Sequence, residues 1–325
     1  TMEEAVFGCD DITKLNKDSS NGYGCLKDKE DYFDFTAKVI KEPGLKILAD
    51  FKNKCDTDTL SIKDVLCTEV FKDELRMSEK RVTPRTFRVM PMPHIVWMKK
   101  IFADMVRKLR PGLHTHGMCI GLNPYKDFDA IARKLLKCEV MCDADFGKWD
   151  GSLHVGIMRL IHEVFLEKYK GIDRSVLDKL LVTTYNSNVL VYDAIYRTTH
   201  GLPSGTWLTL VMNCIYNKCL TALILCRNGS TDCLDTYEVV DYVMGDDKIC
   251  GASGKYAKWF NAMTIKQVSE SLGMKCTNGD KSEITTNSRP FHTLDFLKRK
   301  FYYDVRLGKY MGSLSKDTIC NTLQW

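Results

Sequence analysis

The segment Tyr237–Cys250 constrains the fold more than any other part of the chain. Two strand-like runs, Tyr237–Val243 and Lys248–Cys250, flank the tripeptide Gly245-Asp-Asp247. Glycine and aspartate between such runs favour a tight turn, so the sequence predicts a β-hairpin with two carboxylates at its tip. The same residue types occur in ordinary turns, so the hairpin by itself does not predict a function.

Helices and strands are mixed along the rest of the chain without a strict βαβ alternation. Apolar residues follow the helical period over Leu153–Tyr169, and a second helix is expected after the loop Gly201–Gly205 and through Cys226. The mixture favours an α+β fold over a doubly wound sheet. Further predicted elements are a helix at Lys255–Leu272 and strands at Glu139–Cys142, Asn188–Tyr196 and Phe296–Tyr303.

The most apolar stretch, Leu208–Cys226, contains Asn213, Asn217 and Lys218. Polar residues at these positions favour a core helix, so we expect no transmembrane segment. The 14 cysteines are scattered, and no C-x-x-C pair occurs among them. This pattern argues against a zinc site and favours reduced, mostly buried thiols.

Positive charge is concentrated in the segment Lys72–Arg110. This segment holds eleven basic and four acidic residues, a local excess of seven, whereas the whole chain carries +5. Such a patch suits a polyanion, either a phosphate backbone or a triphosphate. On charge alone, a solvated basic face explains it equally well.

Three carboxylates are candidates for metal binding. Asp246 and Asp247 can converge on one cation at the hairpin tip, and Asp145 follows another predicted strand. Clustered carboxylates are costly unless they are paired or bind metal, and hard oxygen ligands favour Mg²⁺ or Mn²⁺. Two such ions can activate an attacking 3′-hydroxyl and neutralise a leaving pyrophosphate.

Seven segments, taken together, resemble the motifs of a known enzyme family. Asp145-x4-Asp150, Ser204-Gly205-x3-Thr209-x3-Asn213 and Gly245-Asp-Asp247 are similar, in this order, to palm motifs A, B and C of the RNA-dependent RNA polymerases of positive-strand RNA viruses. The picornavirus-like lineage, order Picornavirales, is the most similar. Motifs G, F, D and E are matched by Ser19–Tyr23, Lys72–Arg76 with Lys80, Arg85 and Arg88, Gly273–Ser282 and Phe296–Arg299.

The resemblance implies a role for each matching residue. Asp145, Asp246 and Asp247 would hold two Mg²⁺ ions, for which Mn²⁺ can substitute, and Lys281 would be the general acid that protonates pyrophosphate. NTP-binding residues would be Lys80, Arg85 and Arg88 at the triphosphate, and Asp150, Ser204, Thr209 and Asn213 around the ribose 2′-hydroxyl. RNA-binding residues would be Ser19, Ser20, Lys72, Arg76 and the primer grip Phe296, Leu297, Lys298 and Arg299.

The fold that the resemblance implies is a right hand of fingers, palm and thumb. The palm would be an RRM-like antiparallel sheet backed by helices. Fingers are expected at residues 1–102 and 153–201, and palm at residues 103–152, with motif A, and 202–304, with motifs B to E. Residues 305–325 would begin a thumb that is largely absent, and the N-terminal part of the fingers is expected to be missing.

The implied function is template-directed RNA synthesis from NTPs for viral genome replication and transcription. Template and primer RNA would be partners, with a small genome-linked protein primer and other viral replication proteins as further candidates. The expected location is the host cell cytoplasm, in membrane-associated replication complexes. Two alternatives stay open: a reverse transcriptase-like DNA polymerase, against which Asp150 and Asn213 argue, and a non-catalytic RNA-binding scaffold.

Two departures from the family pattern affect individual residues. Met244 stands before Gly245, where picornavirus enzymes usually carry tyrosine. The spacing from Lys80 to Arg88 is one residue longer than the picornaviral pattern, so either Arg85 or Arg88 could be the main triphosphate contact.

Overall fold

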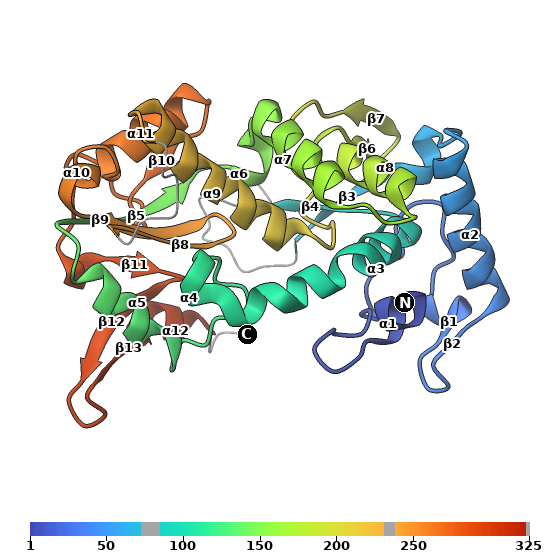
Figure 1. The fold of residues 1–325 in the computed structure, drawn as a ribbon. Helices are drawn as coiled ribbons and strands as arrows, with labels where there is room; N and C mark the ends of the chain where they lie inside the picture. The colour runs from blue at the N-terminus through green and yellow to red at the C-terminus, as the bar shows by residue number, and fades with distance from the viewer. Residues whose placement is uncertain (73–84, 231–237, 323–325) are drawn as a thin grey trace. The chain divides into compact units, whose positions relative to one another are not determined.

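The chain is described from a computed structural model that covers residues 1–72, 85–230 and 238–322. It divides into two compact units, each built from two separate stretches of chain (Figure 1). Unit 1 comprises Thr1–Arg107 and Leu153–Thr209, and unit 2 comprises Lys108–Ser152 and Leu210–Trp325. The expected fingers segments, 1–102 and 153–201, lie in unit 1. The assignment of fingers, palm and thumb to particular residues stays a prediction.

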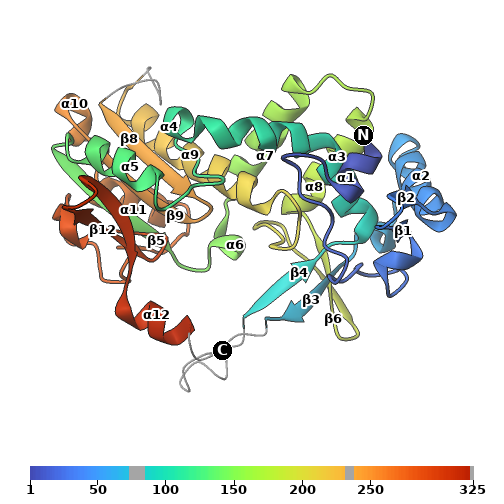
Figure 2. The same cartoon turned by 90° about the horizontal axis from the view of Figure 1, so that it is seen from below.

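Unit 1 is organised around a four-stranded sheet with the order β4-β3-β6-β7. Figure 2 labels three of these strands, β4, β3 and β6. β3 pairs antiparallel with β4 but parallel with β6, so the second stretch of chain completes a sheet that the first begins. Its elements are α1 Met2–Phe7, β1 Phe33–Asp34, β2 Val39–Ile40, α2 Glu42–Asp56, β3 Cys67–Phe71, β4 Thr86–Val89, α3 Met92–Leu109, α7 Val155–Lys168, α8 Arg174–Tyr185, β6 Asn188–Val191 and β7 Ala194–Arg197.

Unit 2 contains a four-stranded antiparallel sheet with the order β10-β5-β9-β8. A three-stranded sheet, β11-β12-β13, follows it along the chain. The elements of unit 2 are α4 Leu113–His116, α5 Asp127–Leu135, β5 Val140–Phe146, α6 Trp149–Ser152, α9 Thr209–Arg227, β8 Val239–Met244, β9 Asp247–Ala252, α10 Gly254–Ala257, α11 Ala262–Ser271, β10 Cys276–Thr277, β11 Asp295–Phe296, β12 Arg299–Asp304, β13 Lys309–Leu314 and α12 Lys316–Thr322.

The two faces of the four-stranded sheet in unit 2 pack against different partners. Alternate strand residues point to opposite faces. Tyr242 and Ile249 belong to a buried cluster with Phe128 of α5 and Phe301 of β12. Residues of the other face, such as Asp241, bond to α9, which runs along the β8–β9 hairpin in Figure 1. The predicted antiparallel sheet backed by helices is therefore confirmed.

Helix α9 coincides with the apolar stretch predicted to be a core helix. It is long and apolar enough to cross a membrane by length and composition alone, yet more than half of its most apolar window is buried inside the fold. Asn213, Asn217 and Thr221 are buried along it and hydrogen-bonded to neighbouring elements of unit 2. These contacts explain why polar residues interrupt the stretch, and they confirm the prediction of a core helix.

Three predicted elements differ from those observed. Asn188–Tyr196 is the hairpin β6–β7 rather than one strand, because Tyr192 has a φ of 54° and the chain reverses there. Phe296–Tyr303 likewise divides at Leu297 and Lys298, whose φ values are 59° and 57°. The predicted helix Lys255–Leu272 divides into α10 and α11, because Asn261 caps α11 by accepting a hydrogen bond from the backbone N–H of Thr264.

Candidate active site

The predicted metal carboxylates Asp145 and Asp247 lie on neighbouring strands of unit 2. Ala144 of β5 pairs with Lys248 of β9, so Asp145 and Asp247 are the next residues outward on the two antiparallel strands. Residues opposite each other in such a pair point to the same face, with Cα atoms about 4.5–5.5 Å apart. The strand register therefore brings together two carboxylates that are 102 positions apart in the sequence.

Asp246 lies in the turn between β8 and β9. Met244 pairs with Asp247, which leaves Gly245 and Asp246 as a two-residue turn. Gly245 has a φ of 68°, a conformation that glycine adopts without the steric cost of a Cβ atom. The predicted hairpin is confirmed, and the exposed Asp246 follows directly from its turn geometry.

The electrostatics of this face favour a bound cation. Burial raises the pKa of Asp247 to about 7, and the neighbouring carboxylates Asp246, Asp145 and Asp295 add to the shift, while Lys281 opposes it. A raised carboxyl pKa means that negative charge here lacks compensation. In the described ranges no group of three His, Cys, Asp or Glu side chains is already gathered to hold a metal ion. The donor chemistry fits a divalent cation, with Asp145 and Asp247 as the residues that face each other.

Lys281, the predicted general acid, reaches this carboxylate cluster. Its Nζ forms an ion pair with Oδ1 of Asp145, although 69% of the lysine side chain is exposed. Lys281 has a φ of 70°, in a turn where its N–H donates to the carbonyl of Asn278. The structure therefore brings Lys281 and Asp145 together, while the proton-transfer role stays a prediction.

Arg289 holds the segment that carries Lys281 against β5. Its Nη1 donates to both carboxylate oxygens of Asp143, at 2.8 and 3.0 Å, and its Nη2 donates to Oδ2 of Asp280 at 2.6 Å. Asp143 is buried and also accepts a hydrogen bond from the backbone N–H of Asp295. Sequence reasoning missed this residue because its partner Asp143 lies 146 positions away and carries no motif of its own.

Asp150 and Asn213, predicted to recognise the ribose, are brought together in unit 2. Nδ2 of Asn213 lies 3.5 Å from Oδ1 of Asp150. Asn213 is buried, and its Oδ1 has no hydrogen-bond partner in the described structure. A buried amide oxygen without a donor is costly, and a ligand hydroxyl would satisfy it. Trp149 packs on Phe146 and Tyr216 and belongs to the core.

The loop with Ser204 and Gly205 lies against strand β4 in unit 1. Gly205 forms a parallel bridge with Val89, and a Cβ on Gly205 would lie 1.9 Å from the carbonyl oxygen of Arg88. This contact brings Arg88 and Ser204, two predicted NTP-binding residues, into one place. The hydroxyl of Thr209 lies within hydrogen-bond distance of the loop carbonyls of Pro203, Ser204 and Thr206. Thr209 therefore shapes the loop, and its contact with a ribose stays a prediction.

The other predicted triphosphate and RNA residues of the basic segment are only partly described. Arg88 lies on β4, and its Nη2 is 3.5 Å from the hydroxyl of Tyr196. Arg85 precedes β4, and its carbonyl accepts a hydrogen bond from the N–H of Lys72. Arg76 and Lys80 lie outside the described residues.

Ser19 and Ser20 lie in an exposed loop that is fixed from behind by Lys29. Nζ of the buried Lys29 donates to the carbonyl of Ser20 at 3.2 Å and to Oγ of Ser19 at 2.9 Å. Sequence reasoning missed Lys29, since a buried lysine cannot be told from a solvated one by its residue type. The proposed contact of the two serines with template RNA stays a prediction.

The predicted primer grip divides between core and surface. Phe296 is only 1% exposed and packs with Phe128, so its side chain belongs to the core and does not face a ligand. Leu297 and Lys298 form the two-residue turn between β11 and β12, and both have positive φ values. Arg299 donates to the carbonyl of Gly312 on β13. RNA contact by this segment stays a prediction, and the turn and Arg299 are its accessible part.

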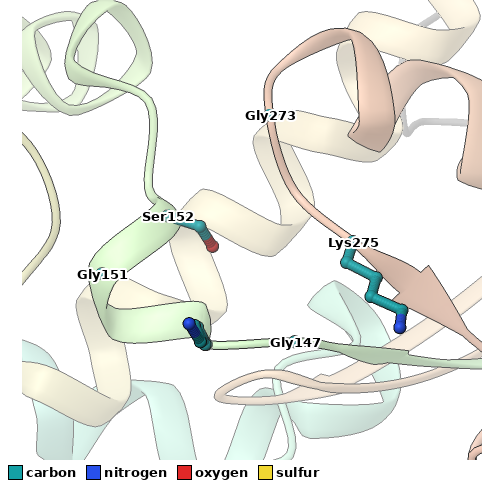
Figure 3. A pocket seen from close by; sticks show the side chains of 6 residues that line it. Gly147, Gly151, Ser152, Gly273 and Lys275 are labelled. Carbon is teal, nitrogen blue, oxygen red and sulfur yellow. The ribbon is translucent and has the colours of Figure 1, made fainter.

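A shallow pocket of unit 2 borders the helix that carries Asp150 (Figure 3). Figure 3 shows Ser152 and Lys275 on opposite sides of it. The N–H of Gly147 donates to the carbonyl of Lys275, which joins the two walls. No sequence pattern indicates this pocket, because its lining comes from two distant segments: Gly147, Lys148, Gly151, Ser152, Gly273 and Lys275.

Comparison with known proteins identifies the family. The family model described as viral RNA-dependent RNA polymerase matches residues 3–325. The chain belongs to this family. The chain of a solved structure, a Sicinivirus 3Dpol RNA-dependent RNA polymerase, superposes with a TM-score of 0.83 at 20% identity, over 100% of this chain and 68% of that one. This likeness establishes the right-hand polymerase fold.

The curated relatives are viral polyproteins of the picornavirus-like lineage. The chain is 28% identical over 358 residues to the replicase polyprotein of acute bee paralysis virus (strain Rothamsted), covering 100% of this chain and 18% of that protein. It is 29% identical over 340 residues to the RNA1 polyprotein of broad bean wilt virus 1, covering 97% of this chain and 18% of that protein. The chain thus spans about a fifth of the length of these relatives. The predicted resemblance is confirmed.

Proposed function

We propose that the chain catalyses template-directed RNA synthesis. A nucleotidyl group would pass from an NTP to the 3′-hydroxyl of an RNA strand, and pyrophosphate would be released. The observation that carries this proposal is the in-register position of Asp145 and Asp247 on one face of the sheet, beside Asp246 in the turn.

Two divalent metal ions, Mg²⁺ or in its place Mn²⁺, are the proposed cofactors, with Asp145, Asp246 and Asp247 as ligands. When bound, such ions supply activation of the attacking hydroxyl and neutralisation of the leaving group. The raised pKa of Asp247 supports this, because a cation would relieve the repulsion from Asp246 and Asp145.

The other side chains would bind and orient the substrates. Arg88 would hold the triphosphate, and Asp150 with Asn213 would accept and orient the ribose 2′-hydroxyl. Lys281 would donate its Nζ proton to an oxygen of the departing pyrophosphate. The unpartnered Oδ1 of Asn213 supports the choice of NTPs over dNTPs, because a 2′-hydroxyl could donate to it.

The biological setting is proposed from the relatives. Their names describe replicase and RNA1 polyproteins, so genome replication and transcription with other viral proteins is the proposed context. The proposed partners are template and primer RNA, NTPs and a genome-linked protein primer. We propose that the chain acts in the host cell cytoplasm, in membrane-associated replication complexes.

A primer-extension assay with Mg²⁺ and NTPs tests the proposal. Asp247→Asn should reduce nucleotide incorporation by about 10³-fold or more, because the metal ions that stabilise the charge of the transition state would lose a carboxylate ligand. The affinity for RNA should stay nearly unchanged. Asp50→Asn is the matched control, since Asp50 lies on α2, where it forms a surface ion pair with Lys54. Equal incorporation by the Asp247 variant and the wild type would remove Asp247 from catalysis. No incorporation by either protein, with RNA binding retained, would favour the non-catalytic scaffold instead.

A further inference from the structure

A buried set of charged and polar side chains lies directly behind the Gly245–Asp246 turn. We call it the hairpin bracket, and it links helix α9 to strands β8 and β9. Lys248 is only 1% exposed although it follows Asp247 in the sequence. The bracket consists of Asn217, Lys218 and Thr221 of α9, Asp241 of β8 and Lys248 of β9.

Asp241 is the centre of the hairpin bracket and has two cationic partners. Its Oδ1 lies 2.5 Å from Nζ of Lys248, and its Oδ2 lies 2.9 Å from Nζ of Lys218. The hydroxyl of Thr221 donates to the same Oδ2 at 2.8 Å and lies 2.7 Å from Nζ of Lys248. Every group of the bracket thus has partners, which is what a buried ionic network requires.

Asn217 connects the hairpin bracket to the turn. Its Oδ1 lies 3.3 Å from Nζ of Lys248, and its Nδ2 lies 3.2 Å from the carbonyl oxygen of Gly245 and 3.4 Å from that of Asp246. An ammonium group only donates, so the amide oxygen must face Lys248 and the amide N–H groups must face the turn. Lys248 therefore fixes the orientation in which Asn217 can hold the turn.

We propose that Asn217 and Lys248 are positioning residues that fix the Gly245–Asp246 turn and thereby place the carboxylates of Asp246 and Asp247 for cation binding. This inference rests on the proposed function. Replacing a buried ion pair with apolar groups is often neutral for stability, so stability alone does not account for the bracket. Groups that orient metal-binding side chains from behind commonly contribute 10- to 100-fold in metal affinity or activity, by analogy with other metal sites.

The variant Lys248→Met tests the positioning role, because simple electrostatics and positioning predict opposite changes in cation affinity. Asp241 keeps Lys218 and Thr221, so the fold should persist. Simple electrostatics predicts tighter cation binding after a positive charge is removed next to Asp247. Positioning predicts Mn²⁺ binding weaker by about tenfold, together with a roughly tenfold lower kcat and an NTP KM within about twofold.

The measurement is Mn²⁺ binding to the purified full chain without RNA, followed by electron paramagnetic resonance, beside NTP kinetics and the thermal midpoint. Lys52→Met is the matched control, since it makes the same substitution on α2, where Lys52 pairs with Asp56, and its Mn²⁺ affinity should equal that of the wild type. Should Lys248→Met fail to fold, the neutral and similarly sized Asn217→Leu, with the same expected losses, replaces it.

The outcomes separate the inference from the proposed function. Weaker Mn²⁺ binding by the variant than by the wild type supports the positioning role. If the wild type makes no RNA, that result overturns the proposed polymerase activity and leaves the positioning role standing. Mn²⁺ binding as tight as, or tighter than, that of the wild type overturns positioning, whether or not RNA is made. A wild type that binds no Mn²⁺ overturns both the metal site and the positioning role.

Discussion

Asn213 is a single side chain whose structure departs from what a buried residue normally shows. Its Nδ2 faces Asp150, but its Oδ1 is buried and unpartnered among the described residues. A buried amide oxygen usually has a donor, which a water molecule or a ligand can supply. This atom is therefore the one on which the proposed choice between ribose and deoxyribose can be tested.

Replacing Asn213 should change which sugar is selected more than it changes stability. Asn213→Leu keeps the approximate side-chain volume and removes the unpartnered oxygen, so the thermal midpoint should stay near that of the wild type. The ratio of kcat/KM for NTP over dNTP should fall by about tenfold, equivalent to one lost hydrogen bond. Single-nucleotide incorporation kinetics measure this ratio. Asn228→Leu, at the end of α9, is the control, and an unchanged ratio in Asn213→Leu would remove Asn213 from ribose selection.

At the scale of elements, strand β5 connects several segments of unit 2. It pairs with both β9 and β10, and Arg289 fastens a third segment to it through Asp143. The same arginine contacts Asp280, the residue before Lys281. One guanidinium group therefore joins the strand that carries Asp145 to the turn that carries Lys281.

Removal of this guanidinium should destabilise unit 2 strongly. Arg289→Met leaves the buried carboxylate of Asp143 without its cation, and we expect the free energy of unfolding to fall by about 3 kcal/mol. Arg289→Lys should cost less, because it keeps the charge and loses only the two-point contact. Urea unfolding followed by circular dichroism measures both. Arg306→Met is the control, as that side chain is 92% exposed; a similar loss there would show that the effect is not specific to Asp143.

At the scale of the whole molecule, lowering the pH should destabilise unit 1 because a buried histidine becomes protonated. Nε2 of His94 lies 2.9 Å from the hydroxyl of Thr183, and complete burial lowers the pKa of His94 to about 4. The unfolded value is near 6.5, so the folded chain favours the neutral ring. The stability from this group is fully present above pH 6.5 and is lost as pH falls towards 4.

The expected loss is about 1.4 kcal/mol per pH unit within that window. His94→Leu should unfold with a shallower dependence on pH between 6.5 and 4 than the wild type. Denaturant unfolding at a series of pH values compares the two slopes, and the exposed His200→Leu should keep the wild-type slope. Identical slopes for wild type and His94→Leu would mean that His94 does not carry this acid sensitivity.

The sequence predicted the parts of the site that depend on local pattern and motif order. Asp145, the hairpin at Asp246–Asp247, the core helix α9 and the antiparallel sheet were all predictable in this way. The Arg289–Asp143 pair and the hairpin bracket were not, because a buried Lys248 has no local signature and the partners are distant in sequence. The hairpin at Tyr192 was hidden because apolar residues continue on both sides of its turn. The hairpin at Leu297 was hidden because neither Leu297 nor Lys298 is a residue type that turns prefer.

The discontinuous make-up of the two units has a consequence for synthesis on the ribosome. β3 pairs with β6 through Cys67 and Val189, and β5 pairs with β9 through Asp143 and Ile249, so each early strand awaits a much later one. At translation rates of about 5–20 residues per second, β3 would wait roughly 6–24 s for β6. During that interval a nascent strand presents an unpaired edge to other chains. The rate of elongation through residues 68–189 therefore sets how long this chain is prone to aggregation before the four-stranded sheet of unit 1 can form.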